Sequence, residues 1–180
     1  MITVIAGTNR PNSLTLTYAQ HIVEDLRGRT DETIALLDLR ELDHSFFTPA
    51  MYDPAKTPAG LRRVQEDLVL QAKKLVIVSP EYNGSFPGVL KTFIDAISVH
   101  RYAENFKHKP VCLIGVSTGR AGNLRGLDHL SGILLHMGAH LLQDKLPISK
   151  AKNWLDDAGK LADENTISAI AKQTAYLTSI

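Results

Sequence analysis

Three short segments of the sequence concentrate side chains that suit an anion or a planar polar ligand. The first, residues 7–15, carries the hydroxyl groups of Thr8 and Ser13 and the guanidinium of Arg10. A guanidinium is a forked, charged donor that matches a phosphate, and a helix starting here would add free backbone N–H groups. The segment lacks the G-x-x-x-x-G-K-[ST] pattern of a nucleotide P-loop and the repeated glycines of a dinucleotide fingerprint. We therefore expect it to bind a phosphate, in addition to forming a helix cap at Ser13.

The second segment, residues 80–88, begins with Pro-Glu-Tyr-Asn-Gly. An Asn-Gly pair favours a tight turn with positive φ, and Ser85 is placed to cap the helix that follows. A turn and a cap would not require Glu81, Tyr82 and Asn83. We expect these residues to offer backbone and side-chain hydrogen bonds to a planar heterocycle.

The third segment, residues 115–123, contains three glycines, which permit a close approach of the backbone to a ligand. It also contains a G-x-S-x-G pattern centred on Ser117, typical of the nucleophile elbow of α/β-hydrolases. A hydrolase of that fold takes its acid and then its histidine from later loops, but the last histidine, His140, precedes both Asp144 and Asp156. We keep serine hydrolysis at Ser117 as a minor alternative and assign Ser117 to hydrogen bonding or close packing beside a ligand.

These segments follow the first, third and fourth of five predicted strands, which are residues 2–6, 33–37, 74–79, 111–117 and 139–142. Apolar residues spaced by three and four predict five helices, around residues 19–26, 61–68, 89–97, 124–137 and 167–177. This alternation predicts an α/β fold, a flavodoxin-like three-layer sandwich with a five-stranded parallel sheet in the order 2-1-3-4-5. In that order, the loops after strands one, three and four meet at one edge. The three segments should therefore form one site.

Length and charge restrict the possible classes of protein. The chain has 180 residues, which predicts a single domain over residues 1–180. Its 20 basic and 19 acidic residues give a formal net charge of +1, which argues against nucleic acid or an anionic membrane as the main partner. We found neither a signal peptide nor a membrane span, so we expect a cytoplasmic protein. The single cysteine, Cys112, lies in an apolar run and is expected in the core.

Two histidine-containing features have simple interpretations. His136 and His140 have a spacing that can bind a metal on a helix, but Gly138 lies between them and no carboxylate completes the set. We therefore predict no metal site. His100, Arg101, Lys107 and His108 make the segment around Tyr102 and Phe106 basic and aromatic. We expect it to form a solvated connection before the fourth strand; the alternative is a site for a nicotinamide phosphate.

Residues 44–60 form a long connection with three prolines, so no regular element is expected there. The segment nevertheless carries Phe46, Phe47, Met51 and Tyr52. Exposed aromatic side chains favour a partner surface. We expect part of this segment to form a dimer contact bordering the site. The alternative is that its aromatic residues fold back on the core.

The three segments together resemble the NADPH-dependent FMN reductase family, which includes quinone, chromate and azo-dye reductases. The similar patterns are Gly-Thr-x-Arg-x-x-Ser-x-Thr from Gly7, Pro-Glu-Tyr-Asn-x-x-x-Pro-Gly-x-x-Lys from Pro80, and Gly-x-Ser-x-Gly-x-x-Gly from Gly115. The second pattern is the most specific, and the resemblance extends from the first predicted strand to the fourth predicted helix. The chain departs from the family at Asn123, where members often carry a second glycine.

The resemblance implies FMN as cofactor and assigns three groups of residues to it. The FMN phosphate would be held by Thr8, Arg10, Ser13, Leu14 and Thr15, with Asn12 shaping the loop. The isoalloxazine ring would lie along Pro80, Glu81, Tyr82, Asn83 and Gly84. The other side of the ring would be closed by Ser117, Thr118, Gly119 and Arg120.

The implied activity is an FMN-dependent NAD(P)H oxidoreductase. A hydride would pass from NADPH or NADH through bound FMN to an acceptor such as a quinone, free flavin, chromate or azo compound. The flavin performs this chemistry, so no separate catalytic residue is expected. The resemblance also implies a homodimer or a dimer of dimers. A flavodoxin-like electron carrier is the main alternative, but flavodoxins are usually strongly acidic and this chain is not.

Overall fold

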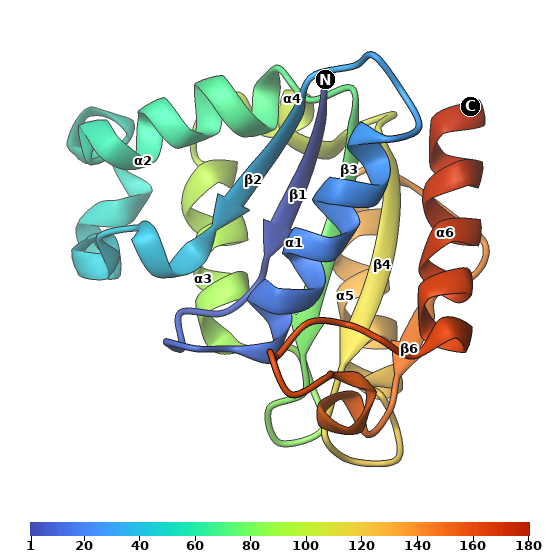
Figure 1. The fold of residues 1–180 in the computed structure, drawn as a ribbon. Coiled ribbons are helices and arrows are strands. Elements are labelled where there is room, and N and C mark those ends of the chain that lie inside the picture. Colours follow the sequence, from blue (N-terminus) through green and yellow to red (C-terminus); the bar gives the residue numbers. More distant parts are fainter.

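The computed structural model describes residues 1–180 as a parallel sheet with helices on both faces (Figure 1). The strand order β2-β1-β3-β4-β5 confirms the predicted topology. The strands are β1 (Ile2–Ala6), β2 (Ile34–Asp38), β3 (Lys74–Pro80), β4 (Pro110–Val116), β5 (His140–Leu141) and β6 (Leu146–Ile148).

The helices agree with those predicted from apolar spacing, and one further helix, α4, was not predicted. The helices are α1 (Leu14–Arg27), α2 (Ala59–Val64), α3 (Gly88–Ser98), α4 (Tyr102–Phe106), α5 (Leu124–His136) and α6 (Glu164–Ser179). The second predicted helix is divided, because α2 continues directly into a π-helical turn over Gln65–Leu70. None of these helices combines the length and the apolar character needed to cross a membrane.

The sheet has two apolar faces because successive side chains of a strand point in opposite directions. In β3, Leu75 and Ile77 pack with α2, α3 and α5, whereas Val76 and Val78 pack with α1 and α6. Strands buried on both faces explain the continuous apolar runs of the sequence. Cys112 is buried on the α1 and α6 side, as predicted, and burial raises the pKa of its thiol to about 12.

The predicted fifth strand over residues 139–142 is present as β5, whereas the sixth strand of the sheet, β6, was not predicted. Two short pieces, β5 and β6, pair one after the other with β4, through Pro110 with His140 and through Ile114 with Leu146. Between them the chain leaves the ladder, and Lys145 forms an ion pair with Asp128 of α5. Lys145, in the gap between the two strands, is therefore directed toward α5.

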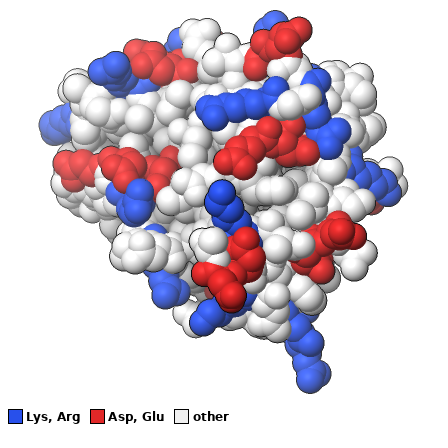
Figure 2. Space-filling model, viewed as in Figure 1, with Lys and Arg blue, Asp and Glu red and all other residues white.

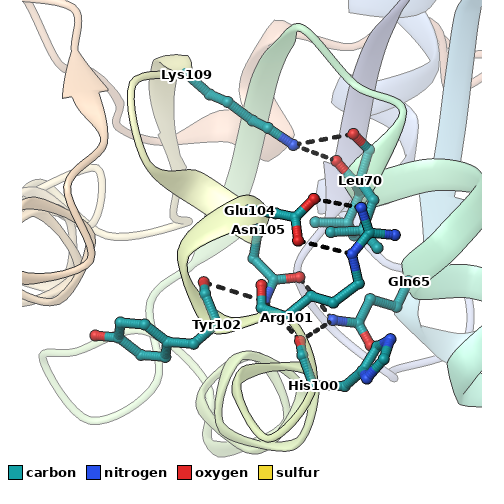
Figure 3. A network of polar contacts seen from close by, with 9 residues as sticks. Gln65, Leu70, His100, Arg101, Tyr102, Glu104, Asn105 and Lys109 are labelled. Carbon is teal, nitrogen blue, oxygen red and sulfur yellow. Dashed lines mark hydrogen bonds and ion pairs between the residues drawn. The ribbon is translucent and has the colours of Figure 1, made fainter.

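The connection over residues 100–109 is mostly exposed, as predicted, but it is not wholly solvated. The segment contains α4, and both Asn105 and Phe106 are fully buried. Asn105 belongs to a polar network at the amino edge of the sheet (Figure 3). The side-chain amide of Gln65 donates to Oδ1 of Asn105 at 2.8 Å and to the carbonyl of Ile97 at 2.8 Å. These hydrogen bonds join the π-helical turn to α3 and α4.

Residues 44–60 are irregular, as predicted, and consist largely of short 3-10 turns. Their aromatic and apolar side chains are divided between two environments. Phe46 and Met51 are buried in the core, as the alternative interpretation proposed, whereas Phe47 and Tyr52 are 70% and 68% exposed. Tyr52 also lines a cavity of about 780 Å³ beside α3 and α5. The segment thus both contributes to the core and presents aromatic surface.

Candidate functional site

The loops after β1, β3 and β4 surround a polar cavity of about 200 Å³ at the carboxyl edge of the sheet. It is lined by Thr8, Arg10, Asn12, Ser13, Leu14, Thr15, Pro80, Glu81, Tyr82, Val116, Ser117 and Thr118. The structure therefore brings together most of the predicted site residues. The cavity lining does not include Asn83, Gly84, Gly119 and Arg120.

The first turn of α1 offers unpaired donors to this cavity. Ser13 caps the helix, and its side chain accepts the N–H of Leu16 at 3.2 Å, as the sequence predicted. The N–H groups of Leu14 and Thr15 have no hydrogen-bond partner. No acidic residue lies in the first turn of α1, so the positive end of the helix dipole is not compensated. These features suit an anion.

The guanidinium of Arg10 is a free positive charge beside the start of α1. Arg10 is exposed and forms no ion pair with any carboxylate. Its backbone N–H donates to the hydroxyl of Thr8 at 3.3 Å, which fixes the path of the loop. Asn12 shapes the same loop through a positive φ of 52°. The guanidinium therefore remains available to a phosphate.

The second loop is a tight turn held to the first loop. Asn83 and Gly84 both have positive φ, as in a type I′ turn, and Tyr82 and Ser85 exchange backbone hydrogen bonds of 2.8 and 3.1 Å. The Tyr82 hydroxyl lies 2.8 Å from the hydroxyl of Thr8. This hydrogen bond joins two walls of the cavity.

The prediction that Ser85 caps the next helix is wrong. Pro87 occupies the position before α3, and no side chain caps that helix. The hydroxyl of Ser85 instead lies 2.9 Å from Nδ1 of His129 on α5. The fold brings α5 alongside the turn, and this contact is not visible in the local sequence.

Two glycines of the third loop serve internal packing. A Cβ atom on Gly115 would lie 2.2 Å from the carbonyl oxygen of Gly122, and one on Gly122 would lie 2.7 Å from the backbone of Pro147 in β6. These positions need glycine because the loop packs against itself and against β6. The interpretation that all three glycines serve a ligand is therefore incorrect for these two.

Ser117 has no histidine partner. Its hydroxyl accepts the N–H of Gly119 at 3.0 Å, and its own N–H donates to the carbonyl of Ile148 at 3.0 Å. A serine nucleophile needs a base within hydrogen-bond distance. Since His129 contacts Ser85 instead, the geometry does not support the hydrolase alternative.

Two residues near the cavity were not predicted as parts of it. Val116 lines it, but in the sequence it reads as the end of an apolar strand. Asn123 is fully buried between the second and third loops with a positive φ of 67°. An asparagine at the end of a glycine-rich loop could have indicated the left-handed backbone conformation of Asn123. It could not have indicated the hydrogen-bond partners of its side chain.

The larger cavity beside α3 and α5 has a different character. Of its lining residues, Lys91 is paired with Asp95 at 2.7 Å, so this cation is already neutralised. Its other lining residues come mainly from the middle and the end of α3 and α5. The structure also shows no group of three or more side chains able to hold a metal, and His140 lies 3.5 Å from His108 rather than forming a pair with His136. The smaller polar cavity is therefore the better site for a phosphate.

A parallel sheet in this order, with a polar cavity lined by the loops after β1, β3 and β4 at its carboxyl edge, defines a flavodoxin-like protein. Residues 1–153 match the model of the NADPH-dependent FMN reductase family, and the chain belongs to that family.

The comparisons also identify individual relatives. An NAD(P)H-dependent FMN reductase from Pseudomonas aeruginosa is 35% identical over 121 residues, which cover 67% of this chain and 64% of the relative. A 2-hydroxy-1,4-benzoquinone reductase from Burkholderia sp is 32% identical, covering 58% of this chain and 57% of the relative. Both matches thus span less than two thirds of the relative's length. An FMN-dependent NADPH-azoreductase from Staphylococcus aureus is 30% identical, covering 73% of this chain and 67% of the relative.

Solved structures support the fold. A flavoenzyme NAD(P)H:(acceptor) oxidoreductase from Paracoccus denitrificans superimposes with a TM-score of 0.81 at 24% identity, covering 99% of this chain and 94% of that one. An archaeal flavodoxin superimposes with a TM-score of 0.58 at 9% identity, covering 99% and 97% of the two chains. These likenesses confirm the flavodoxin-like architecture.

Proposed function

We propose that the protein binds FMN in the polar cavity and uses it as an NAD(P)H-dependent oxidoreductase. The observation that carries this proposal is the set of unsatisfied donors in the first loop: the N–H groups of Leu14 and Thr15 and the free guanidinium of Arg10. A phosphate monoester is a compact dianion that such donors match. Bound FMN would supply the hydride chemistry.

The residues of this chain would bind and orient the cofactor. The first loop would hold the phosphate, assisted by the hydroxyl groups of Thr8, Ser13 and Thr15. Residues 80–84 and 117–120 would enclose the ring. Since Ser117 has no base beside it, we assign no side chain a nucleophilic role.

The relatives support a small-molecule acceptor. One relative is named as a benzoquinone reductase and another as an azoreductase. We propose that this protein passes electrons from NADPH or NADH to an acceptor of this kind by alternate binding of donor and acceptor. Lys and Arg residues are interspersed with Asp and Glu on the visible face (Figure 2), unlike the acidic surface expected of a flavodoxin-like carrier. We also propose a cytoplasmic location, where NAD(P)H is available.

The decisive test is the spectrum and reactivity of the purified protein. We expect it to retain or take up FMN, and NADPH or NADH should bleach the flavin absorbance rapidly and fully in anaerobic stopped-flow. The reduced flavin should then be reoxidised by a quinone. If the protein binds FMN but neither nucleotide reduces it, the electron-carrier alternative is favoured.

We propose a homodimer, alone or as half of a dimer of dimers, with part of residues 44–60 in the interface. Support comes from the exposed side chains of Phe47 and Tyr52 and from the position of Tyr52 on the cavity beside α3 and α5. Light scattering at micromolar concentration should give the mass of two or four chains, and Tyr52→Glu should weaken the assembly. A clean monomer with full reductase activity would contradict this interface.

A further inference from the structure

Asn123 occupies an unusual position at the start of α5. It is fully buried, and its φ of 67° lies in the left-handed region that few residues other than glycine and asparagine adopt. Although it stands at the N-cap of α5, its side chain does not cap that helix. The buried amide must therefore serve another purpose.

The amide of Asn123 is bonded to the end of β3. Its Nδ2 donates to the carbonyl of Pro80 at 2.8 Å and to the carbonyl of Ser79 at 3.0 Å, with the Ser79 hydroxyl 3.2 Å away. The backbone N–H of Asn123 also donates to Oε2 of Glu81 at 3.3 Å. One residue of the third loop thus contacts three consecutive residues, Ser79, Pro80 and Glu81, where β3 ends and the second loop begins.

These contacts act at the end of the pairing between β3 and β4, where Pro80 is the partner of Val116. Pro80 is the last residue of β3 and has no N–H to donate to a neighbouring strand. Both Pro80 and Glu81 line the polar cavity, whereas Asn123 does not. Any effect of Asn123 on a ligand must therefore pass through the residues that it holds.

We propose that Asn123 is a positioning residue that ties the second loop to the third and so determines the shape of the pocket for the FMN ring. This inference rests on the proposed function, in which residues 80–84 and 117–120 enclose that ring. It adds a residue outside the cavity whose hydrogen bonds control the ring-binding walls without touching the ligand.

The surroundings of Asn123 are built for an amide in one orientation. Its Oδ1 is buried without a partner, whereas Nδ2 faces only oxygen atoms, so rotating the amide would bring oxygen against two carbonyl groups. A Cβ atom on Gly126 would lie only 2.0 Å from Oδ1, so glycine there makes the space for the side chain. The donors of the amide, rather than its acceptor, are what this site uses.

Two substitutions separate the amide from the backbone conformation. Asn123→Gly retains the left-handed conformation and removes the side chain. Asn123→Asp keeps the shape but replaces the donor with an oxygen facing the carbonyls of Ser79 and Pro80. His108→Gly is a matched control, because His108 is exposed, also has a positive φ of 63°, and lies at the opposite edge of the sheet.

The experiment measures the affinity of each variant for FMN and for riboflavin, which lacks the phosphate. We expect Asn123→Gly to raise both dissociation constants about tenfold, the effect expected from losing buried hydrogen bonds, while their ratio stays unchanged. Asn123→Asp should give at least the same loss, and His108→Gly none. Unchanged flavin affinities in either folded Asn123 variant would overturn the proposal, even if thermal stability falls.

A second measurement does not depend on flavin. Hydrogen exchange of the Tyr82 and Ser85 amides, which pair with each other in the turn, should accelerate in the flavin-free Asn123→Gly protein. Unchanged exchange would refute the tie between the loops. If wild-type protein binds neither FMN nor riboflavin, the proposed function fails, and accelerated exchange would still establish that Asn123 holds the second loop. If the glycine variant does not fold, the same measurements on Asn123→Asp decide the proposal.

Discussion

The two edges of the same sheet use polar groups in opposite ways. At the amino edge, the buried amides of Gln65 and Asn105 find partners within the protein, and the ammonium of Lys109 donates to the carbonyl of Val69 at 2.7 Å (Figure 3). At the carboxyl edge, the N–H groups of Leu14 and Thr15 have no partner.

This difference distinguishes polar groups that stabilise the fold from polar groups that are available to a ligand. Buried polar groups that are fully paired stabilise the arrangement of elements, because exposing or breaking any one of them leaves its partner unsatisfied. Donors left open beside a cavity contribute nothing to folding until a ligand arrives. Substitutions at the amino edge should therefore affect stability, and those at the carboxyl edge should affect affinity.

The largest effect is expected from breaking the amino-edge network. Asn105→Ala would leave the carbonyl groups of Ile97 and His100 without this donor and should lower the free energy of unfolding by about 3 kcal/mol. Urea denaturation measures the change, with Asn165→Ala on the exposed surface of α6 as control. FMN affinity measured well below the unfolding transition should stay within about twofold of wild type, since the network lies far from the site. A large loss of affinity in the folded variant would mean that the two edges are coupled.

The reverse result is expected for Arg10→Ala at the carboxyl edge. Hydrogen bonds to charged groups contribute about 1.5–3 kcal/mol, so FMN affinity should fall about tenfold or more while the urea midpoint stays unchanged. Riboflavin affinity should hardly change, because that ligand has no phosphate. The matched control is Arg63→Ala, whose guanidinium is largely exposed. Equal FMN affinity of variant and wild type would remove Arg10 from the site.

A smaller effect is expected on the pH dependence of stability, through Lys109 at the amino edge. Burial lowers the pKa of Lys109 from 10.5 to about 8, so between these values the unfolded chain binds more protons than the folded one. This residue therefore makes stability rise as pH increases through that window. The raised pKa values of Cys112 and Tyr18, both about 12, act in the opposite direction above about pH 9, so the comparison must be made against a variant.

Lys109→Met supplies that comparison. The difference in unfolding free energy between wild type and variant should shift in favour of wild type between pH 8 and pH 10.5, as measured by urea denaturation at several pH values. A difference that stays constant with pH would show that the ammonium of Lys109 is not held in a desolvated position.

Much of the fold could be predicted from the sequence because its signals are local. The alternating burial of Leu75 and Val76 follows from strand geometry, and the helices follow from apolar spacing. The first loop was recognisable as a candidate anion site because its features come from neighbouring residues, with Ser13 as helix cap and Arg10 beside it. The Asn83-Gly84 turn was likewise predictable from the φ preferences of those two residues.

The remaining features depend on partners that are distant in the chain. Gln65 and Asn105 are separated by 40 residues, and the amide of Asn123 reaches the carbonyl of Ser79 across 44. The pairing of Ser85 with His129 and the ion pair of Lys145 with Asp128 also depend on where α5 packs. The sequence by itself determined the main helices and strands, their order, and which three loops carry polar groups, but not α4 or β6. Only the tertiary structure decided which of those groups are paired inside the protein and which stay open to a ligand, because hydrogen bonding depends on distances between segments that no local pattern specifies.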